Sequence, residues 1–149
     1  LSRFVSVQSE YNMLERDIER ELLPAARVYG VGLLPYYPLA GGLLTGKYSR
    51  DEMPEGTRLA NTPKLAGRYV TEENWRRLDR LNAFCAARQR SLLELAFAWL
   101  LAEPTTASVI AGATRPGQVE ANVNAARWTL SGEERSEVAT ILTPETSGG

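Results

Sequence analysis

Short apolar runs and longer stretches of helical periodicity alternate along most of the chain. Polar and apolar residues alternate at Phe4–Gln8, which predicts a strand. Apolar residues spaced by four then predict a helix over residues 15–28, which Pro24 either kinks or restarts. A second apolar run, Val31–Pro35, predicts a strand that is buried on both faces.

The second half of the chain begins with signals for the start of helices. Thr71 stands before two glutamates, which predicts an N-cap followed by negative charge in the first turn. Ser91 and Ser131 each stand three residues before a glutamate, which is the pattern of a capping box. The helix expected after Ser91, over Leu92–Leu101, is apolar nearly all round and should be packed on several sides.

A third apolar run, Ala107–Ala111, predicts another short strand, and a turn leads from it into a helix. Val119, Val123 and Ala126 are expected to form the inner face of that helix. Strands that alternate with helices predict an α/β fold with a parallel sheet and crossover helices. Three strands are few for an independent sheet, so we expect the fold to be incomplete in this chain.

The segment at residues 49–70 shows no periodicity, because prolines and glycines interrupt a polar stretch. It predicts a long loop, and loops of this length are usually functional or mobile. Arg58 and Arg68 within it are expected to be solvated surface charges. We interpret residues 1–149 as a single partial domain whose last residues, 143–149, form a frayed tail.

Composition narrows the class of protein. The chain is 44% hydrophobic with a net charge of −1, so the basic surface typical of a nucleic-acid-binding protein is not expected. No apolar run is long enough to cross a membrane, and no signal peptide is recognised. Cys85 is the only cysteine, which favours a reducing compartment such as the cytoplasm. Because histidine is absent, no metal site is expected.

Chemistry-bearing residues follow the predicted strands at their carboxyl ends, where ligands bind in parallel α/β folds. Gln8, at the end of the first strand, can donate to and accept from a carboxamide. Tyr36, after the second strand, can stack on a planar heterocycle, and Lys47 ends the glycine-rich turn that follows. This combination is expected to hold a flat, anionic ligand.

The turn after the third strand has features of an anion site. The amides of Thr114–Pro116 lie at a predicted helix N-terminus, and Arg115 adds a cation that suits a phosphate. Gln118 and Asn122 are four residues apart on one helix face, where they can bond to the edge of a base. Taken singly, each residue is as readily explained by packing or backbone hydrogen bonds. Their shared sheet end favours a nucleotide.

The glycine-rich turn also contains a second motif. Gly41–Lys47 matches G-x-x-x-x-G-K, the start of a phosphate-binding P-loop. That motif continues with a serine or threonine that binds magnesium, and Tyr48 stands there instead. A P-loop is therefore a minor alternative, beside a glycine-rich surface loop that binds no ligand.

Three segments resemble the aldo-keto reductase family, in particular its bacterial and potassium-channel-beta-like branch. They follow the family's order and cover nearly the whole chain: Phe4–Asn12, Tyr37–Tyr48 and Val109–Asn122. The family is a (β/α)8 TIM barrel that binds NADPH without a Rossmann domain. The resemblance implies that this chain is the C-terminal part of such a barrel, strands six to eight with the helices that follow.

The resemblance also implies a role for each matching residue. Gln8 would hold the nicotinamide carboxamide, and Tyr36 would stack on its ring, with Tyr37 as the alternative for stacking. The residues implied to line the pyrophosphate are Pro38, Leu39, Gly41 and Lys47. Those implied to contact the adenosine ribose and its 2′-phosphate are Gly112, Thr114 and Arg115, with Gln118 and Asn122 near the adenine.

The family's catalytic tetrad of Asp, Tyr, Lys and His comes from the first part of the barrel, so no catalytic residue is assigned here. The resemblance implies the cofactor-binding part of an NADPH-dependent reductase of aldehydes or ketones, inactive by itself, with the 49–70 loop at the rim of the carbonyl substrate. The alternative is a non-catalytic NADP(H)-binding module that senses redox state, like channel beta subunits. Alone, the chain is expected to self-associate through its open sheet edges.

Overall fold

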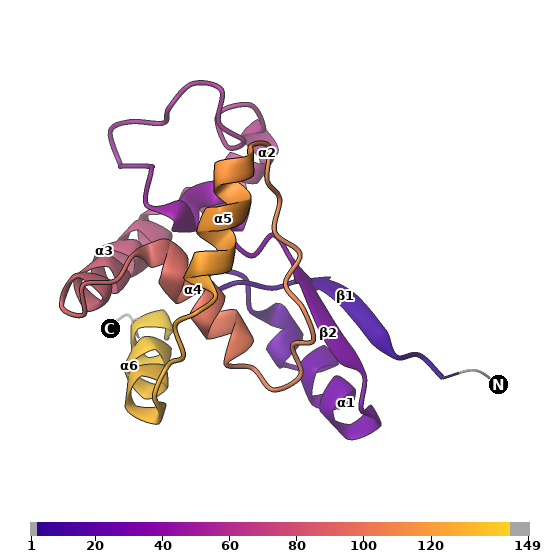
Figure 1. The fold of residues 1–149 in the computed structure, drawn as a ribbon. Helices are drawn as coiled ribbons and strands as arrows, with labels where there is room; N and C mark the ends of the chain where they lie inside the picture. The colour runs from indigo at the N-terminus through magenta and orange to yellow at the C-terminus, as the bar shows by residue number, and fades with distance from the viewer. Residues whose placement is uncertain (1–2, 144–149) are drawn as a thin grey trace, which may run out of the picture.

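The computed structural model describes residues 3–143 (Figure 1). In chain order, the elements are β1 (Ser6–Glu10), the 3-10 helix η1 (Asp17–Glu19), α1 (Leu22–Tyr29), β2 (Gly32–Tyr36), the 3-10 helix η2 (Ala40–Thr45), α2 (Pro63–Tyr69), α3 (Glu72–Ala86), α4 (Leu92–Leu101), α5 (Pro116–Ala125) and α6 (Gly132–Leu142). This order confirms the predicted alternation of strands and helices. No helix among the described residues has the length and apolarity needed to span a membrane. The predicted frayed tail, apart from Thr143, lies outside the described residues.

The two strands are parallel, as predicted. Gln8 lies opposite Leu34 and Glu10 opposite Tyr36. β1 starts two residues later than the predicted strand, and the side chains at the start of that prediction, Phe4 among them, are exposed. The crossover between the strands contains η1 and α1, so the predicted helix over residues 15–28 restarts rather than bends.

The predicted third strand is an extended segment beside β2, joined to it by two isolated bridges. Leu33 bonds on both sides, donating to the Thr105 carbonyl at 2.8 Å and accepting from the Ala107 amide at 2.9 Å. The regular ladder stops at the next step because Pro35 has no N–H to donate. The Pro35 carbonyl instead accepts from the Ile110 amide, so the segment gains one residue on β2, as in a β-bulge.

Helix starts follow the predicted caps. The Thr71 hydroxyl accepts from the backbone amide at the third position of α3, and Ser91 and Ser131 form reciprocal capping boxes at α4 and α6. Pro24 lies in the first turn of α1, where its missing N–H leaves no helical bond unmade. The sequence did not predict α2, which begins at Pro63 inside the expected 49–70 loop.

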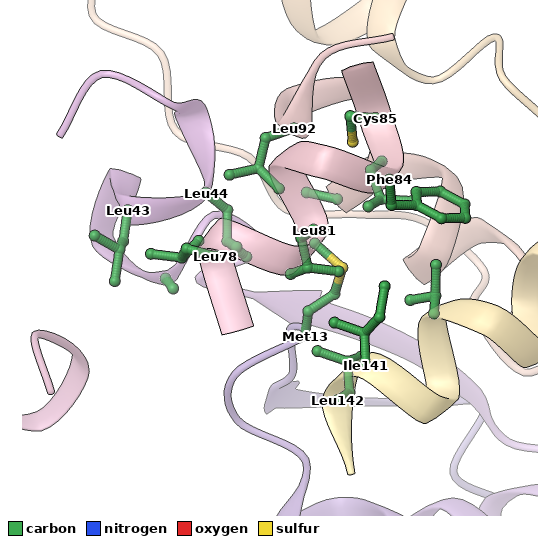
Figure 2. Close-up of a cluster of buried hydrophobic side chains, with 14 of the residues drawn as sticks. Met13, Leu43, Leu44, Leu78, Leu81, Phe84, Cys85, Leu92, Ile141 and Leu142 are labelled. Carbon is green, nitrogen blue, oxygen red and sulfur yellow. The ribbon is translucent and has the colours of Figure 1, made fainter. Parts of the chain in front are cut away.

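The core lies between the sheet and the helices. The apolar stripe of α3 is buried, and it meets η2, α4 and α6 in one apolar cluster (Figure 2); its members are Leu78, Leu81, Phe84 and Cys85. Figure 2 shows Leu81 near the centre of this cluster, with Ile141 and Leu142 of α6 facing it. A second, smaller cluster lies under β2, where Leu33 packs with Leu23 of α1 and Leu100 of α4. Helices therefore cover one face of the sheet.

The inner face predicted for α5 is wrong. Val119 and Val123 are 53% and 57% exposed, and Ala126 is also exposed. α5 packs on α4 and buries Ala125 instead. Within residues 3–143, no element covers the side of α5 that carries the two valines, so these valines pack against nothing there.

Candidate functional site

The site lies at the carboxyl ends of the parallel strands. The register places Glu10 beside Tyr36, and a bridge places Tyr36 beside Ile110. The chain then continues from Ile110 to the start of α5 (Figure 1). The predicted convergence of three strand ends is therefore present in the part of the chain that the structure describes.

Near these strand ends, the face of the sheet that carries Gln8, Leu34 and Tyr36 is open to solvent. Gln8 is exposed, and it projects to the same side as Leu34 because partners in a sheet share a face. Tyr36 and Ile110 are 38% and 42% exposed. Helices cover the opposite face of the sheet, which carries the buried Leu33, so only the open face can be reached by a ligand.

Two aromatic rings stand at the end of β2. Tyr36 and Tyr37 meet edge to face, with ring centroids 5.5 Å apart. Arg58 lies over the Tyr37 ring, 4.7 Å from its centroid, and donates to its hydroxyl at 3.1 Å. Because Arg58 covers one face of Tyr37, the exposed Tyr36 is the ring better placed to stack on a ligand. The interpretation of Arg58 as a merely solvated charge is wrong.

The turn after β2 has an unusual backbone. Ala40, Gly41 and Gly42 all have positive φ, at 49°, 69° and 105°. A Cβ on Gly41 would lie 2.8 Å from a Leu59 methyl, so only glycine fits between this turn and the following segment. The predicted site residues Pro38 and Leu39 precede this turn, Pro38 buried and Leu39 partly so.

Lys47 ends the turn with an exposed side chain. Its ammonium lies 5.3 Å from the Tyr48 ring centroid, and no carboxylate among the described residues pairs with it. The P-loop alternative is wrong for this segment, because a P-loop runs directly into an α-helix at the lysine. Here the next helix begins only at Pro63, and Tyr48 is buried.

The start of α5 uses its own cap. The Gln118 carboxamide oxygen accepts from the Thr114 amide at 2.7 Å and the Arg115 amide at 3.1 Å. The prediction that these amides are free for an anion is therefore wrong. The Arg115 guanidinium stays exposed and forms no ion pair with the described residues, and Gly112 before it is exposed as well. Asn122 is partly buried on the same helix.

A polar network joins β1 to α2. Asn12 is fully buried, and its amide donates at 2.9 Å to both the Tyr37 carbonyl and the Tyr69 hydroxyl. Tyr69 donates to Glu10, whose other oxygen bonds to Arg68 at 2.8 Å. Burial, and next the hydrogen bond to Glu10, raise the pKa of Tyr69, so its hydroxyl keeps the proton that it donates.

The sequence did not predict this polar network between β1 and α2. Arg68, expected to be solvated, also bonds to Glu15 at 2.5 Å and so holds α2 against two acidic side chains. Partners more than fifty residues apart leave no local spacing that could reveal them. Asn12 had one local signal, because asparagine oxygens often accept from amides two residues on, as Asn12 does from Leu14.

The chain is similar to known proteins of one family. The family model described as "Aldo/keto reductase family" matches residues 1–143. A probable voltage-gated potassium channel subunit beta from rice is 37% identical over 141 residues, covering 93% of this chain and 40% of the relative. An NADH-specific methylglyoxal reductase from Escherichia coli is 36% identical over 129 residues, covering 84% of this chain and 38% of that protein.

A comparison with solved structures points to the same family. The glycerol dehydrogenase of Gluconobacter oxydans matches with a TM-score of 0.75 at 30% identity, covering 97% of this chain and 45% of that one. The chain thus spans about 40% of the length of these curated relatives. The expected fold class, part of a (β/α)8 barrel, is confirmed. The chain belongs to the aldo/keto reductase family.

Proposed function

We propose that this chain is the cofactor-binding part of an NADPH-dependent reductase that acts on aldehydes or ketones. The observation that carries the proposal is the meeting of the parallel strand ends at one open edge, where Tyr36 ends β2 and Gln8 lies two residues before the end of β1 on the same open face. The cofactor supplies the hydride, and residues of this chain bind and orient it. Polypeptide outside these 149 residues donates the proton to the carbonyl oxygen.

The residues present fit a phosphorylated dinucleotide. Lys47 and Arg115 are exposed and have no carboxylate partner among the described residues, so their charge is available to phosphate groups. Tyr36 offers an exposed ring at the end of β2, and Gln8 offers both a donor and an acceptor. The other residues proposed to line the cofactor are Pro38, Leu39, Gly41, Gly112, Thr114, Gln118 and Asn122.

Binding of the two nicotinamide dinucleotides tests this proposal. We expect the natural-length protein to bind NADPH more tightly than NADH, because only NADPH carries the 2′-phosphate that Arg115 is proposed to meet. Arg115→Gln should weaken NADPH binding about tenfold and leave NADH binding unchanged. The matched control is Arg127→Gln, on an exposed arginine just after α5. Equal losses for both dinucleotides, or none, would refute the assignment.

A second candidate function is a redox sensor that binds NADP(H) without turnover. It is supported by three relatives that are named as voltage-gated potassium channel subunits beta, from rice, Arabidopsis thaliana and Schizosaccharomyces pombe. Steady-state oxidation of NADPH with a reactive aldehyde separates the two functions. We expect turnover by the natural-length protein and none by the isolated 149 residues, since the latter have no proposed proton donor.

We also propose that the isolated chain self-associates. Among the described residues β1 pairs only with β2, and large apolar side chains are exposed at Phe4, just before β1, and at Val119 and Val123 on α5. Unpaired strand edges with apolar neighbours favour pairing with another chain. Sedimentation velocity is expected to show dimers or larger species, and a monodisperse, folded monomer would contradict this.

A further inference from the structure

A cavity of about 410 Å³ lies on the helical side of the molecule, away from the open face of the sheet. Residues of η1, α1, α4 and α6 line it, together with Tyr11 just after β1. None of the eleven proposed cofactor residues is among them.

The two carboxylates in the cavity are already satisfied. Glu19 accepts from the Tyr11 hydroxyl at 2.8 Å and from two nitrogens of Arg16 at 2.9 and 2.7 Å. Glu103, 7% exposed, accepts from Arg27 and from the Thr105 amide and hydroxyl. These carboxylates therefore offer an incoming ligand little capacity for further hydrogen bonds.

Glu103 is held in its charged form. Burial by itself raises the pKa of Glu103, but hydrogen bonds from Arg27 and Thr105 outweigh burial and keep that pKa below its ordinary value. Burial, and next the charge of Glu19, raise the pKa of Tyr11, so the phenol remains a donor. Glu103 thus stays charged and paired with Arg27 at neutral pH.

The unused polar groups of the cavity are mainly donors. Arg16 and Arg27 each bond to their glutamate through two nitrogens, which leaves the third nitrogen of each guanidinium without a hydrogen-bond partner among the described residues. Arg135 of α6 has no hydrogen bond or ion pair from its side chain among the described residues. With three arginines and two glutamates, the cavity has one positive charge in excess.

One wall of the cavity is aromatic. The Trp99 ring lies 4.9 Å from the Tyr11 ring between centroids, and the Arg16 guanidinium lies over it at 5.9 Å. These contacts fix Arg16 between the indole and Glu19, so its remaining N–H groups are held in place rather than free to rotate. A fixed fork of donors suits an oxyanion better than a mobile surface lysine does.

We propose that this cavity binds a small oxyanion, the carboxylate or phosphate group of a metabolite, through Arg135 together with Arg16 and Arg27. Excess positive charge, unused N–H donors and satisfied carboxylates all select an acceptor-rich anion over a cation or a neutral amide. The site is separate from the proposed dinucleotide site, and its occupancy joins α6 to α1.

Calorimetric titration of the natural-length protein tests the proposal, with inorganic phosphate and citrate as probes at constant ionic strength. We expect saturable binding of at least one probe, and the stronger probe tells phosphate from carboxylate recognition. Arg135→Gln should weaken that binding about tenfold, the cost of one charged hydrogen bond. Arg127→Gln, an exposed arginine outside the cavity, should leave it unchanged.

The proposed dinucleotide site also attracts phosphate, so Arg115→Gln is the second control. Loss of probe binding in Arg115→Gln but not in Arg135→Gln would overturn the cavity assignment while leaving the dinucleotide proposal intact. Equal losses of probe binding in Arg135→Gln and Arg127→Gln would show that binding depends only on surface charge, which would overturn the proposal. Absence of saturable binding of either probe would overturn it as well. Circular dichroism of each variant checks that the fold is retained.

Discussion

The two faces of the small sheet differ sharply. On one face Leu33 is fully buried against α1 and α4, whereas on the other Tyr36, three residues along the same strand, is 38% exposed. The covered face holds the apolar clusters that stabilise the fold. The open face carries the residues proposed to bind the cofactor. One strand thus serves stability with one side and ligand access with the other.

The helices show the same difference. α4 buries side chains on nearly all sides, as its sequence predicted, whereas α5 buries only Ala125 and presents two valines to solvent. Both helices carry apolar residues suited to packing, so the apolar pattern alone does not tell which helix is packed. If stability is concentrated on the covered side, substitutions there should cost the most.

The largest expected effect is on the covered side. Leu81→Ala should lower the free energy of unfolding by about 3 kcal/mol, because the fully buried side chain leaves a cavity in the main cluster. Val119→Ala in the same 149-residue chain should change it by less than about 0.5 kcal/mol. Urea denaturation measures both. Comparable losses of unfolding free energy in the two variants would show that α5 is packed against a partner surface. The covered and exposed helices would then not differ in their contribution to stability.

The next largest effect is expected in the polar network that joins β1 to α2. Asn12→Ala should cost about 2 kcal/mol, because it leaves the buried Tyr69 hydroxyl and the Tyr37 carbonyl without their amide partner. Asn124→Ala, on exposed α5, is the matched control and should cost less than about 0.5 kcal/mol. If the two variants unfold at the same urea concentration, the network does not stabilise α2.

On the open face the expected effect is on binding rather than stability. Tyr36→Ala should weaken NADPH binding about tenfold, since stacking on a base is worth about 1–3 kcal/mol. Tyr37→Ala should weaken it less, because Arg58 already covers that ring. Fluorescence titration of the two variants decides between the rings. A larger loss for Tyr37→Ala would reverse the assignment.

A smaller effect is expected at a helix cap. Ser91→Ala should lower the free energy of unfolding by about 1 kcal/mol, because the capping box at α4 loses the hydroxyl that accepts from Glu94. Replacing Ser91 with threonine keeps the acceptor and should restore most of that loss. Thermal unfolding measures both variants. An unchanged melting temperature in Ser91→Ala would show that packing alone holds α4.

The smallest effect depends on pH. The hydrogen bond from the Ser91 backbone, ahead of the contact with Arg90, lowers the pKa of Glu94 below its ordinary value of 4.5. A carboxyl group whose folded pKa is lowered stabilises the fold above the unfolded pKa, and loses that contribution as pH falls through the folded pKa. The stability difference between wild type and Glu94→Gln should therefore narrow below about pH 4.5. Glu120→Gln, on exposed α5, is the control for the pH scan.

Much of the local structure was predictable because its causes lie within a few residues. The caps at Thr71, Ser91 and Ser131 each depend on a neighbour three positions away, and all three were confirmed. The helix at Pro63 was missed because its N-cap makes no side-chain bond and Gly67 interrupts its interior. The third strand was predicted as regular, but Pro35 on the adjacent strand removes the donor that regularity needs.

For the candidate site, the sequence by itself determined which chemical groups lie at or near each strand end: the amide of Gln8, the ring of Tyr36 and the cation of Arg115. It also carried the family resemblance, which needs only residue order. The tertiary structure decided which groups are available. It paired Arg68 with Glu10 across 58 positions and covered Tyr37 with Arg58. Spacing along the chain specifies contacts within one element, whereas contacts between elements exist only once packing has brought distant residues together.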